Sequence, residues 1–504
     1  MSDEEEHRLV RERRAKVARW RAEGRQPYPW AFPGRVPTSD VVAACRGLAA
    51  GAGNPEVRLR VAGRLLAVRS HGKSAFLDLT DLAGTLQLFA RVDELEETGF
   101  KRWLADLDPG DILGADGTPM VTRRGEPSLL VEELTLLAKA ILPPPEKFHG
   151  LADVETRIRQ RYVDLLASET SRARFVARAL LTRETRRFLD DRGFLEFETG
   201  VLVPTASGAA AEPFRTQSNW LDQSLQLRIA LELPLKRLLV GGLERVYEIG
   251  HVFRNEDMDT VHSPEFTMLE VYWAYTDYQD MLQLVEGLYA RLARGAAELL
   301  PEEPAAATAP SVFTAPFARV DFVQALEQRS GISGLLTRSR EELRKLAREA
   351  GATVPDDSST GKFLDKLFDH YVVPTLERPT FVMDHPASTT PLAKRHREKA
   401  GRVERFELYY RGVELANAYT ELNDPDEQEA RFREQLGGKG DDVYALDTDF
   451  LTALRYGMPP ASGLGIGVDR MMMSLLGATT IKDVILFPPT RSKDGPASEP
   501  GAGL

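Results

Sequence analysis

A change in hydrophobic pattern near residue 140 constrains the fold of this chain more than any other feature. From Val57 to about Ala138, apolar and polar residues alternate in short segments that glycine and Asp-Pro-Gly turns separate. One helix-like stretch, residues 94–107, interrupts these segments. From Asp153 onward, helical and strand patterns mix over a span too long for one small β-domain. The chain of 504 residues therefore contains at least two domains of different architecture.

The first pattern predicts a barrel and the second predicts an α+β fold. Five short strands with one helical insertion are typical of a small Greek-key barrel of the OB type. In the second region, residues 172–193 predict an amphipathic helix that ends at Gly193, and the strand-like segments join in hairpins rather than in βαβ units. We expect an antiparallel β-sheet flanked by helices, with strands at 225–230, 244–254, 264–275, 404–422 and 463–468.

These patterns divide the chain into five segments. A charged helix over residues 4–24 precedes the barrel, and two low-complexity stretches are expected to carry no chemistry, a surface insertion at 299–316 and the C-terminal tail. The predicted segments are the N-terminal helix and extended arm at 1–56, the barrel at 57–142, a stiff linker at 143–152, the α+β domain at 153–490 and a disordered tail at 491–504.

Composition excludes several classes of protein. Cys45 is the single cysteine, which rules out an internal disulfide framework and is typical of a reducing compartment, so a cytoplasmic location is expected. No segment has the apolar length of a membrane span or the pattern of a targeting signal. The net charge of −11 means that a nucleic-acid partner would need a local basic patch.

Acidic side chains interrupt two otherwise apolar strand faces. Because side chains alternate along a strand, Glu270 shares a face with Phe266, Met268 and Tyr272. A buried carboxylate without a cation is costly, so Glu270 has either a salt-bridge partner or the positive group of a ligand beside it. The alternation leaves both possibilities open.

The second such face carries three polar residues, Asn417, Tyr419 and Glu421. A hairpin that turns at Arg411–Gly412 makes Glu407 and Glu414 diagonal neighbours on one face. Paired carboxylates at this spacing suit Mg²⁺ that is bound together with phosphates. Strict alternation places Glu414 and Asn417 on opposite faces, so we expect a bulge near Leu415.

The glycine-rich stretch SGLGIGVDRMMM, residues 462–473, is not a dinucleotide-binding loop. That fingerprint needs its third glycine at position 468, which is valine, and no βαβ unit surrounds the stretch. HGKS at 71–74 lacks the first glycine of a Walker A loop and predicts a barrel turn. We expect the glycines to form a flat strand, Asp469 to orient its neighbour Arg470 or to cap the next helix, and that helix to pack through Met471, Met472 and Met473.

Several motifs together resemble one enzyme family. VFRNE followed by HSPEF, within residues 252–266, resembles motif 2 of the class II aminoacyl-tRNA synthetases, and GLGIGVDR resembles their motif 3. With KFHGLADVETRIRQRYVDLL, LKRLLVGGLERVYEIG, PLAKRHRE, NAYTELNDP and DVILFP, the similarity to the lysyl-tRNA synthetase family extends over about residues 57–490. The order of these motifs makes the resemblance highly specific.

The resemblance implies an enzyme that activates lysine with ATP to lysyl-adenylate and pyrophosphate and then transfers the lysyl group to the 3′ end of tRNA(Lys). Arg254 matches the arginine that bridges the substrate carboxylate and the α-phosphate, and Arg470 matches the arginine on the terminal phosphate. The other residues implied in ATP binding are Glu256, His262, Phe266, which would stack on adenine, and the carboxylates for the Mg²⁺ cofactor, Glu407 and Glu414.

The resemblance also implies an amino-acid site and an anticodon site. Glu270, Tyr272 and Glu421 match the residues that receive the lysine side-chain ammonium, and the other matches around lysine are Gly208, Glu232 and Asn417. An acid-lined pocket favours a cationic side chain, which disfavours the related aspartyl and asparaginyl enzymes. In the barrel, the positions that match anticodon-reading residues are Arg69, Phe76, Gln87 and Glu133.

A few positions depart from the family pattern. Gly200 stands where motif 1 normally has a proline at the dimer interface, so the implied homodimer rests on less than the full motif, and further departures near the substrate are Ser207, Glu212, Pro234 and Ser263. Two rival functions are a catalytically silent, synthetase-like RNA-binding protein and a ligase that attaches lysine to elongation factor P. The first predicts loss of Arg254, Arg470 or the paired carboxylates, and the second lacks the barrel. The sequence therefore favours an active tRNA synthetase.

Overall fold

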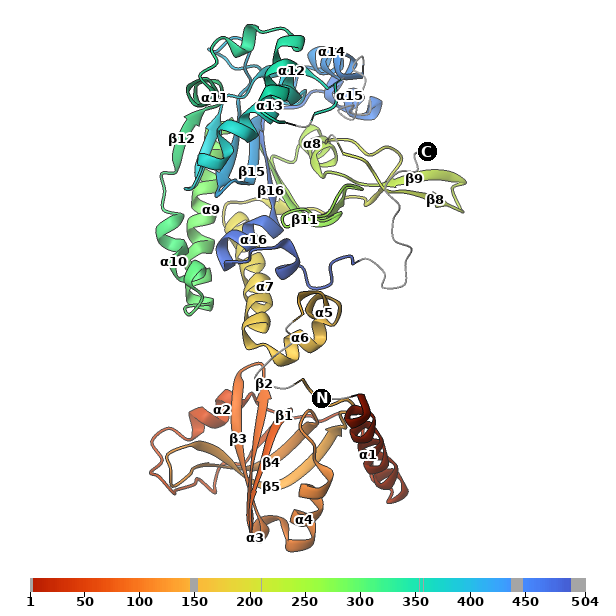
Figure 1. Ribbon diagram of the computed structural model, residues 1–504, viewed down its shortest axis with the longest axis vertical. Helices are drawn as coiled ribbons and strands as arrows, with labels where there is room; N and C mark the ends of the chain where they lie inside the picture. Colours follow the sequence, from red (N-terminus) through yellow and green to blue (C-terminus); the bar gives the residue numbers. More distant parts are fainter. Residues whose placement is uncertain are drawn as a thin grey trace. The chain divides into compact units, whose positions relative to one another are not determined.

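The computed structural model describes residues 3–145, 153–209, 211–352, 354–356, 358–436 and 447–490. The chain divides into two compact units, Met1–Ala152 and Asp153–Leu504, and each is described by itself (Figure 1). No helix within the described ranges is long and apolar enough to cross a membrane. The predicted tail at 491–504 and most of the predicted linker, residues 146–152, lie outside the described residues.

The first unit is a closed five-stranded barrel, as the sequence predicts. Alternation along its strands buries Ala75, Leu77 and Leu79 in the barrel core, while Phe76 between them is only half-buried. The strands close in the order β1-β2-β3-β5-β4, with β3 and β5 parallel. Their bounds are β1 (Leu59–His71), β2 (Ser74–Asp81), β3 (Gly84–Arg91), β4 (Ile112–Val121) and β5 (Pro127–Ala138).

Among the described residues of the first unit, four helices accompany the barrel: α1 (Asp3–Ala22), α2 (Thr38–Ala44), α3 (Val92–Leu95) and α4 (Glu97–Asp106). The last two form the predicted helical insertion, which breaks at Glu96, where φ is +58°. The arm is not extended throughout, because α2 lies within it and buries Val41 in the barrel core. The Asp81 carboxylate accepts hydrogen bonds from the backbone N–H and the hydroxyl of Thr38 at the start of this helix. This tertiary contact has no signature in the local sequence.

The second unit is built on an eight-stranded sheet in the order β12-β13-β14-β15-β16-β11-β10-β6. The six central strands are antiparallel, as predicted, whereas each edge strand pairs in parallel with its neighbour. The strands are β6 (Leu195–Glu196), β10 (Arg245–Phe253), β11 (Glu265–Ala274), β12 (Ala318–Asp321), β13 (Thr380–Met383), β14 (Arg405–Tyr410), β15 (Val413–Thr420) and β16 (Ala461–Gly467). A separate small sheet contains β7 (Leu202–Val203), β8 (Arg215–Ser218) and β9 (Gln223–Leu227).

Because side chains alternate along the central strands, they pack into two apolar cores, one on each face of the sheet. Leu269 and Val271 of β11 pack on one side with α7 (Glu169–Asp190), α9 (Tyr278–Leu299), α10 (Pro304–Val312) and α16 (Val468–Leu476). Phe266, Met268 and Tyr272 face the other side, with α8 (Glu232–Val240) and α15 (Thr448–Arg455). The predicted two faces of this strand are therefore confirmed, and the covering helices can be followed in Figure 1.

The remaining elements surround these layers. A third apolar cluster joins α11 (Phe322–Ser330), α12 (Arg340–Glu349) and α13 (Thr360–Tyr371). The other helices are α5 (Val154–Arg159), α6 (Arg161–Ala167) and α14 (Pro425–Leu436), and the short 3-10 turns are η1 (Leu335–Thr337), η2 (Val373–Thr375), η3 (Ala387–Thr389) and η4 (Ile481–Asp483).

The prediction of a surface insertion at 299–316 is wrong. This stretch contains α10, whose Ala306 and Ala309 are buried, as is Phe313 just after it. The helix packs against α9 and α16. Alanine is the strongest helix former, and Pro304 occupies the first helical position, where its missing N–H costs nothing. The small side chains that looked like low complexity therefore form part of the main core.

Candidate active site

A cavity of about 500 Å³ lies over the central strands of the second unit. It gathers residues from the β10–β11 and β14–β15 hairpins, from α8 and from the β16–α16 junction. Of the residues predicted for the ATP and lysine sites, all except Glu421 line it: Gly208, Glu232, Arg254, Glu256, His262, Phe266, Glu270, Tyr272, Glu407, Glu414, Asn417 and Arg470. Segments far apart in the sequence thus meet in one pocket.

The register of the sheet explains this convergence. Glu407 pairs with Asn417, Asn417 pairs with Gly465, and Gly465 pairs with Glu270, so one row crosses β14, β15, β16 and β11. Residues in one row point to the same face of a sheet. In the next row, Gly463 lies between the two tyrosines Tyr419 and Tyr272.

The glycines of β16 leave room for the side chains of its neighbours. A Cβ added to Gly463 would lie 2.0 Å from Oε1 of Glu421 and 2.6 Å from the ring of Tyr272, so no other residue fits at this position. The predicted flat strand is confirmed. The following helix buries Met471, Met472 and Met473, as expected for a packing face.

A β-bulge places Glu414 beside Asn417. Leu408 pairs with Ala416 while Tyr409 pairs with Glu414, so Leu415 is an extra residue on β15. The bulge restores Glu414 to the pocket face, where it lines the cavity together with Asn417. The predicted bulge is therefore confirmed.

Glu407 and Glu414 form one acidic end of the pocket. Glu407 pairs with the Arg405 guanidinium and accepts a hydrogen bond from the Tyr409 hydroxyl at 2.8 Å. Burial raises the pKa of Glu407, but Arg405, His385 and these hydrogen bonds outweigh it and hold the pKa below its ordinary value. Burial and the charge of Glu407 raise the pKa of Glu414 to about 7, although 37% of its side chain is exposed. Two carboxylates that repel each other in this way suit a divalent cation.

The donor set of this end fits Mg²⁺ bound with phosphates. Within the described ranges, no group of three or more histidine, cysteine, aspartate or glutamate side chains could hold a metal ion alone. Mg²⁺ usually takes one or two carboxylates and completes its octahedron with water and phosphate oxygens. Glu407 and Glu414 therefore supply what such a shared site needs from the protein.

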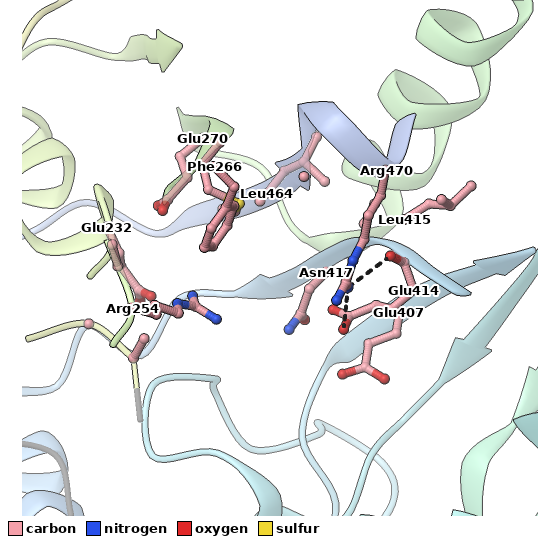
Figure 2. A pocket seen from close by; sticks show the side chains of 18 of the residues that line it. Glu232, Arg254, Phe266, Glu270, Glu407, Glu414, Leu415, Asn417, Leu464 and Arg470 are labelled. Carbon is pink, nitrogen blue, oxygen red and sulfur yellow. Dashed lines mark hydrogen bonds and ion pairs between the residues drawn. The ribbon is translucent and has the colours of Figure 1, made fainter. Parts of the chain in front are cut away.

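Arg470 lies beside this acidic end, as Figure 2 shows. Its guanidinium donates to the Glu414 carbonyl oxygen at 3.3 Å and to Nε2 of His262 at 2.8 Å. Because arginine only donates, Nε2 of His262 accepts, and Nδ1 carries the proton that it shares with Asp259 at 2.7 Å. The loop between β10 and β11 is thereby tied to α16.

Arg254 lies beside Glu232 in Figure 2, and its guanidinium stacks over the Phe266 ring at 5.3 Å. Its Nε donates to the Ile229 carbonyl oxygen at 3.3 Å. In the part of the chain that the structure describes, no carboxylate forms an ion pair with it. Its guanidinium is thus placed to receive an anion from the cavity.

Glu232 and Glu270 form the second acidic end, which Figure 2 shows separated from Glu407 and Glu414. Glu270 is only 5% exposed and accepts hydrogen bonds from the Leu231 backbone and the Tyr272 hydroxyl, both at 2.9 Å. Burial and the charge of Glu232 raise the pKa of Glu270 to about 7. Within the described residues no cation forms an ion pair with Glu270, whose hydrogen-bond donors are neutral, and a cationic ligand would supply one.

Glu421 does not line the cavity. It is fully buried and pairs with the ammonium of Lys236, a residue that the sequence interpretation missed. Lys236 also pairs with Glu232 one helical turn before it, and this i,i+4 spacing is the signal that could have revealed it. Burial, reinforced by Glu232 and Glu270, raises the pKa of Glu421 to about 8 although Lys236 lowers it.

Asp469 does not cap α16. Its carboxylate accepts from the Thr267 backbone N–H at 2.7 Å and pairs with Arg178 of α7, while the helix start has no side-chain cap. Of the two expected roles, capping is wrong. The observed contacts fix the first turn of α16, which carries Arg470, against β11 and α7.

The predicted anticodon residues lie outside the barrel core. Phe76 stacks on Phe89 with ring centroids 4.8 Å apart, and Arg69, its cross-strand partner, binds Asp78 through two hydrogen bonds. Gln87 accepts a hydrogen bond from Ser128 of β5 at 3.1 Å, and Glu133 is exposed. The sequence interpretation missed Phe89, although alternation along β3 places it on the same face as Gln87.

Comparisons with known proteins agree with this architecture. A family model described as tRNA synthetases class II (D, K and N) matches residues 153–491, and one described as an OB-fold nucleic acid binding domain matches residues 59–137. The chain therefore belongs to the class II tRNA synthetases of the D, K and N group.

Several curated relatives that the chain matches are named lysine–tRNA ligases. A lysine–tRNA ligase of Roseiflexus castenholzii is 45% identical over 96% of this chain and 99% of its own length. One of Moorella thermoacetica is 47% identical over 86% of this chain and 89% of its own, and one of Carboxydothermus hydrogenoformans is 41% identical over 98% of this chain and 100% of its own.

Proposed function

We propose that this chain is a lysine–tRNA ligase, which activates L-lysine with ATP to lysyl-adenylate and pyrophosphate and then transfers the lysyl group to the 3′ end of tRNA(Lys). The observation that carries the proposal is a single pocket with an acid-lined end and an arginine- and carboxylate-lined end. The identity of 41–47% to lysine–tRNA ligases over most of the chain supports the same substrate.

In this proposal the arginines position ATP and the lysine carboxylate. Arg254 binds the lysine carboxylate and the α-phosphate together, which aligns the attacking oxygen with phosphorus. Arg470 binds the terminal phosphate, Phe266 stacks on adenine above the flat glycine strand, and Glu256 and His262 lie beside the nucleotide. Glu407 and Glu414 would hold Mg²⁺, which supplies positive charge to the phosphates when it is bound.

The opposite end of the pocket receives lysine. Glu270 and Tyr272 accept the side-chain ammonium, with Glu421 adding negative charge from behind. Glu232 and Gly208 hold the α-amino group, and Asn417 lies near the carboxylate. The burial of Glu270 makes this end selective, because a neutral side chain would leave its carboxylate without a cation.

We assign anticodon recognition to the barrel domain, residues 57–142, and catalysis to residues 153–490. The stacked pair Phe76–Phe89 offers a platform for single-stranded bases, because every base has a π-face that stacks on aromatic rings. Arg69, Gln87 and Glu133 would supply polar contacts around that platform.

A homodimer and a cytoplasmic location complete the proposal. The second unit exposes apolar side chains on its edge strand β6 and on the small sheet, and the largest are Leu195, Leu202, Trp220 and Leu221. Exposed apolar side chains of this size are frequent at subunit interfaces, which supports the proposed homodimer. The single cysteine, Cys45, is typical of a reducing compartment.

The test is amino-acid-dependent exchange of pyrophosphate into ATP, measured with each standard amino acid, followed by charging of tRNA(Lys). Lysine alone should drive exchange, and tRNA(Lys) should accept the product. Exchange driven by aspartate or asparagine contradicts the proposal, and absence of exchange indicates the catalytically silent rival. Lysine-driven exchange without tRNA charging would point to a protein acceptor such as elongation factor P.

A further inference from the structure

Lys236 is a buried cation that the proposed mechanism does not use. Its side chain is fully buried on α8, and its ammonium pairs with Glu232 and Glu421. Three aromatic rings lie 5.4–6.0 Å from the ammonium, those of Tyr272, Tyr419 and Phe450. Burial lowers the pKa of Lys236, but the two glutamates outweigh it and hold the pKa above its usual value. The lysine is therefore a permanent, buried positive charge in contact with the pocket residue Glu232.

The charges at the acidic end of the pocket indicate the role of Lys236. The acidic end contains three carboxylates, those of Glu232, Glu270 and Glu421, for which Lys236 is the cation paired by contact. With all four groups charged, two negative charges remain. Lysine as a substrate brings two ammonium groups, and its carboxylate has Arg254 as partner. An amino acid with a neutral side chain would leave one buried negative charge without a cation.

Two carboxyl groups at this end of the pocket have raised pKa values. The pKa of Glu270 is raised to about 7 and that of Glu421 to about 8, both chiefly by burial. The charged and titratable groups that face them are Glu232 and Lys236 from α8, Arg254 just after β10, Tyr272 from β11 and Tyr419 from β15. Binding of two ammonium groups would favour the charged form of both carboxyls.

We propose that Lys236 is a positioning residue that sets the charge of the amino-acid pocket, so that the pocket takes a substrate with two ammonium groups. The inference rests on the proposed function, because it takes Glu232, Glu270 and Glu421 as the groups that receive lysine. Lys236 acts through Glu232 and Glu421, which it holds by ion pairs, and is not among the described side chains that line the cavity.

Three variants of the full-length enzyme test this role in lysine-dependent pyrophosphate exchange. Lys236→Met removes the cation, Glu421→Gln removes one carboxylate, and the double variant removes both and restores the balance of two negative charges. We expect kcat/KM for lysine to fall about 100-fold in Lys236→Met, because one partner of a buried ion pair is left alone. The double variant should recover about tenfold of that loss, because charge compensation makes paired substitutions non-additive.

A pH profile separates this role from a structural one. Without Lys236 the pKa of Glu421 rises further, so its charged form is present only at higher pH. The KM for lysine of Lys236→Met should therefore fall as the pH is raised from about 6.5 to about 8.5, more steeply than that of the unaltered enzyme. The KM for ATP reports the other end of the pocket and should stay within about threefold of its original value.

Arg237→Met is the matched control, because Arg237 follows Lys236 on α8 but pairs with Asp447 and not with the pocket acids. It should leave the KM for lysine within about threefold. A double variant no better than the worse single variant, or a Lys236→Met enzyme with an unchanged lysine pH profile, overturns the inference. If Lys236→Met does not fold, Glu421→Gln against the double variant decides, since the double must use lysine better. Lysine exchange by the unaltered enzyme tests the proposed function separately.

Discussion

The outer face of the barrel and the pocket of the second unit use similar side chains in different surroundings. On the barrel, Phe76 is half-buried and Arg69 binds Asp78 at the surface, with 45% of the arginine side chain exposed. In the pocket, Glu270 is 5% exposed and Lys236 is fully buried. Water screens the first set of charges and reaches the second set poorly. Substitutions in the pocket should therefore have large effects on the rate of lysine activation, whereas those on the barrel should have modest effects on the KM for tRNA(Lys) alone.

The largest expected effect comes from Arg470→Ala. The variant removes the guanidinium proposed to bind the terminal phosphate and leaves His262 without its donor. Exchange with lysine and ATP should fall about 1000-fold or more, because stabilisation of charge in a site with little water is worth several kcal/mol. Arg433→Ala, which removes a surface i,i+4 pair with Glu429, serves as the control and should leave exchange unchanged. If the Arg470→Ala enzyme kept its rate of exchange, Arg470 would not be the residue that binds the terminal phosphate of ATP.

Glu270→Gln is the next prediction, and it concerns the acidic end. The amide keeps the shape of the side chain but loses its negative charge, so the KM for lysine should rise about 100-fold while the KM for ATP changes little. Glu265→Gln changes an exposed glutamate at the start of the same strand and is the control. Equal effects on lysine and ATP would indicate a general disturbance of the sheet instead.

Phe76→Ala tests the role of the barrel. Loss of one stacking ring should raise the KM for tRNA(Lys) about tenfold. The exchange reaction uses no tRNA, so its rate should not change. Leu82→Ala removes an exposed side chain from the β2–β3 turn and should change neither reaction. A Phe76→Ala enzyme impaired more in exchange than in charging would contradict the assignment of the barrel.

The smallest effect is the pH dependence of lysine binding. Glu270 has a pKa raised to about 7, and a lysine ammonium binds its charged form. As the pH falls from about 7 to about 6, a growing fraction of Glu270 is protonated and the KM for lysine should rise about fivefold. The Glu270→Gln variant should lose this contribution. A KM for lysine that falls at lower pH would contradict this prediction.

Much of the fold could be predicted because its pattern is local. Alternation in Glu265–Ala274 gave the two faces of β11, and the conflict between Glu414 and Asn417 predicted the bulge at Leu415. The helix α2 and the core helix α10 were missed or misassigned. The first depends on a contact between Thr38 and Asp81, and the second buries alanines that composition alone marks as low complexity.

Prediction of the candidate site from the sequence was limited in the same way, by contacts between distant segments of the chain. The motifs identify the residues that line the pocket, because each residue has a fixed place in a motif, whether on a strand such as β11, on a helix such as α16 or in the loop between β10 and β11. The role of Lys236 was not predicted, because its partner Glu421 is 185 positions away in the sequence. Only the pairing of β11, β15 and β16 brings Glu421 next to α8. A lysine in an apolar helix looks like a solvated residue until the fold shows two carboxylates beside it.

The most direct test compares lysine with norleucine, which has the same chain without the side-chain ammonium. According to our proposal, the enclosed carboxylates of the pocket select the side-chain ammonium of lysine. Pyrophosphate exchange at equal enzyme concentration should be driven by lysine and should fall by about 10⁴-fold in kcat/KM with norleucine, since a site built for a polar group rejects the analogue that lacks it. Comparable exchange with both amino acids would contradict the account.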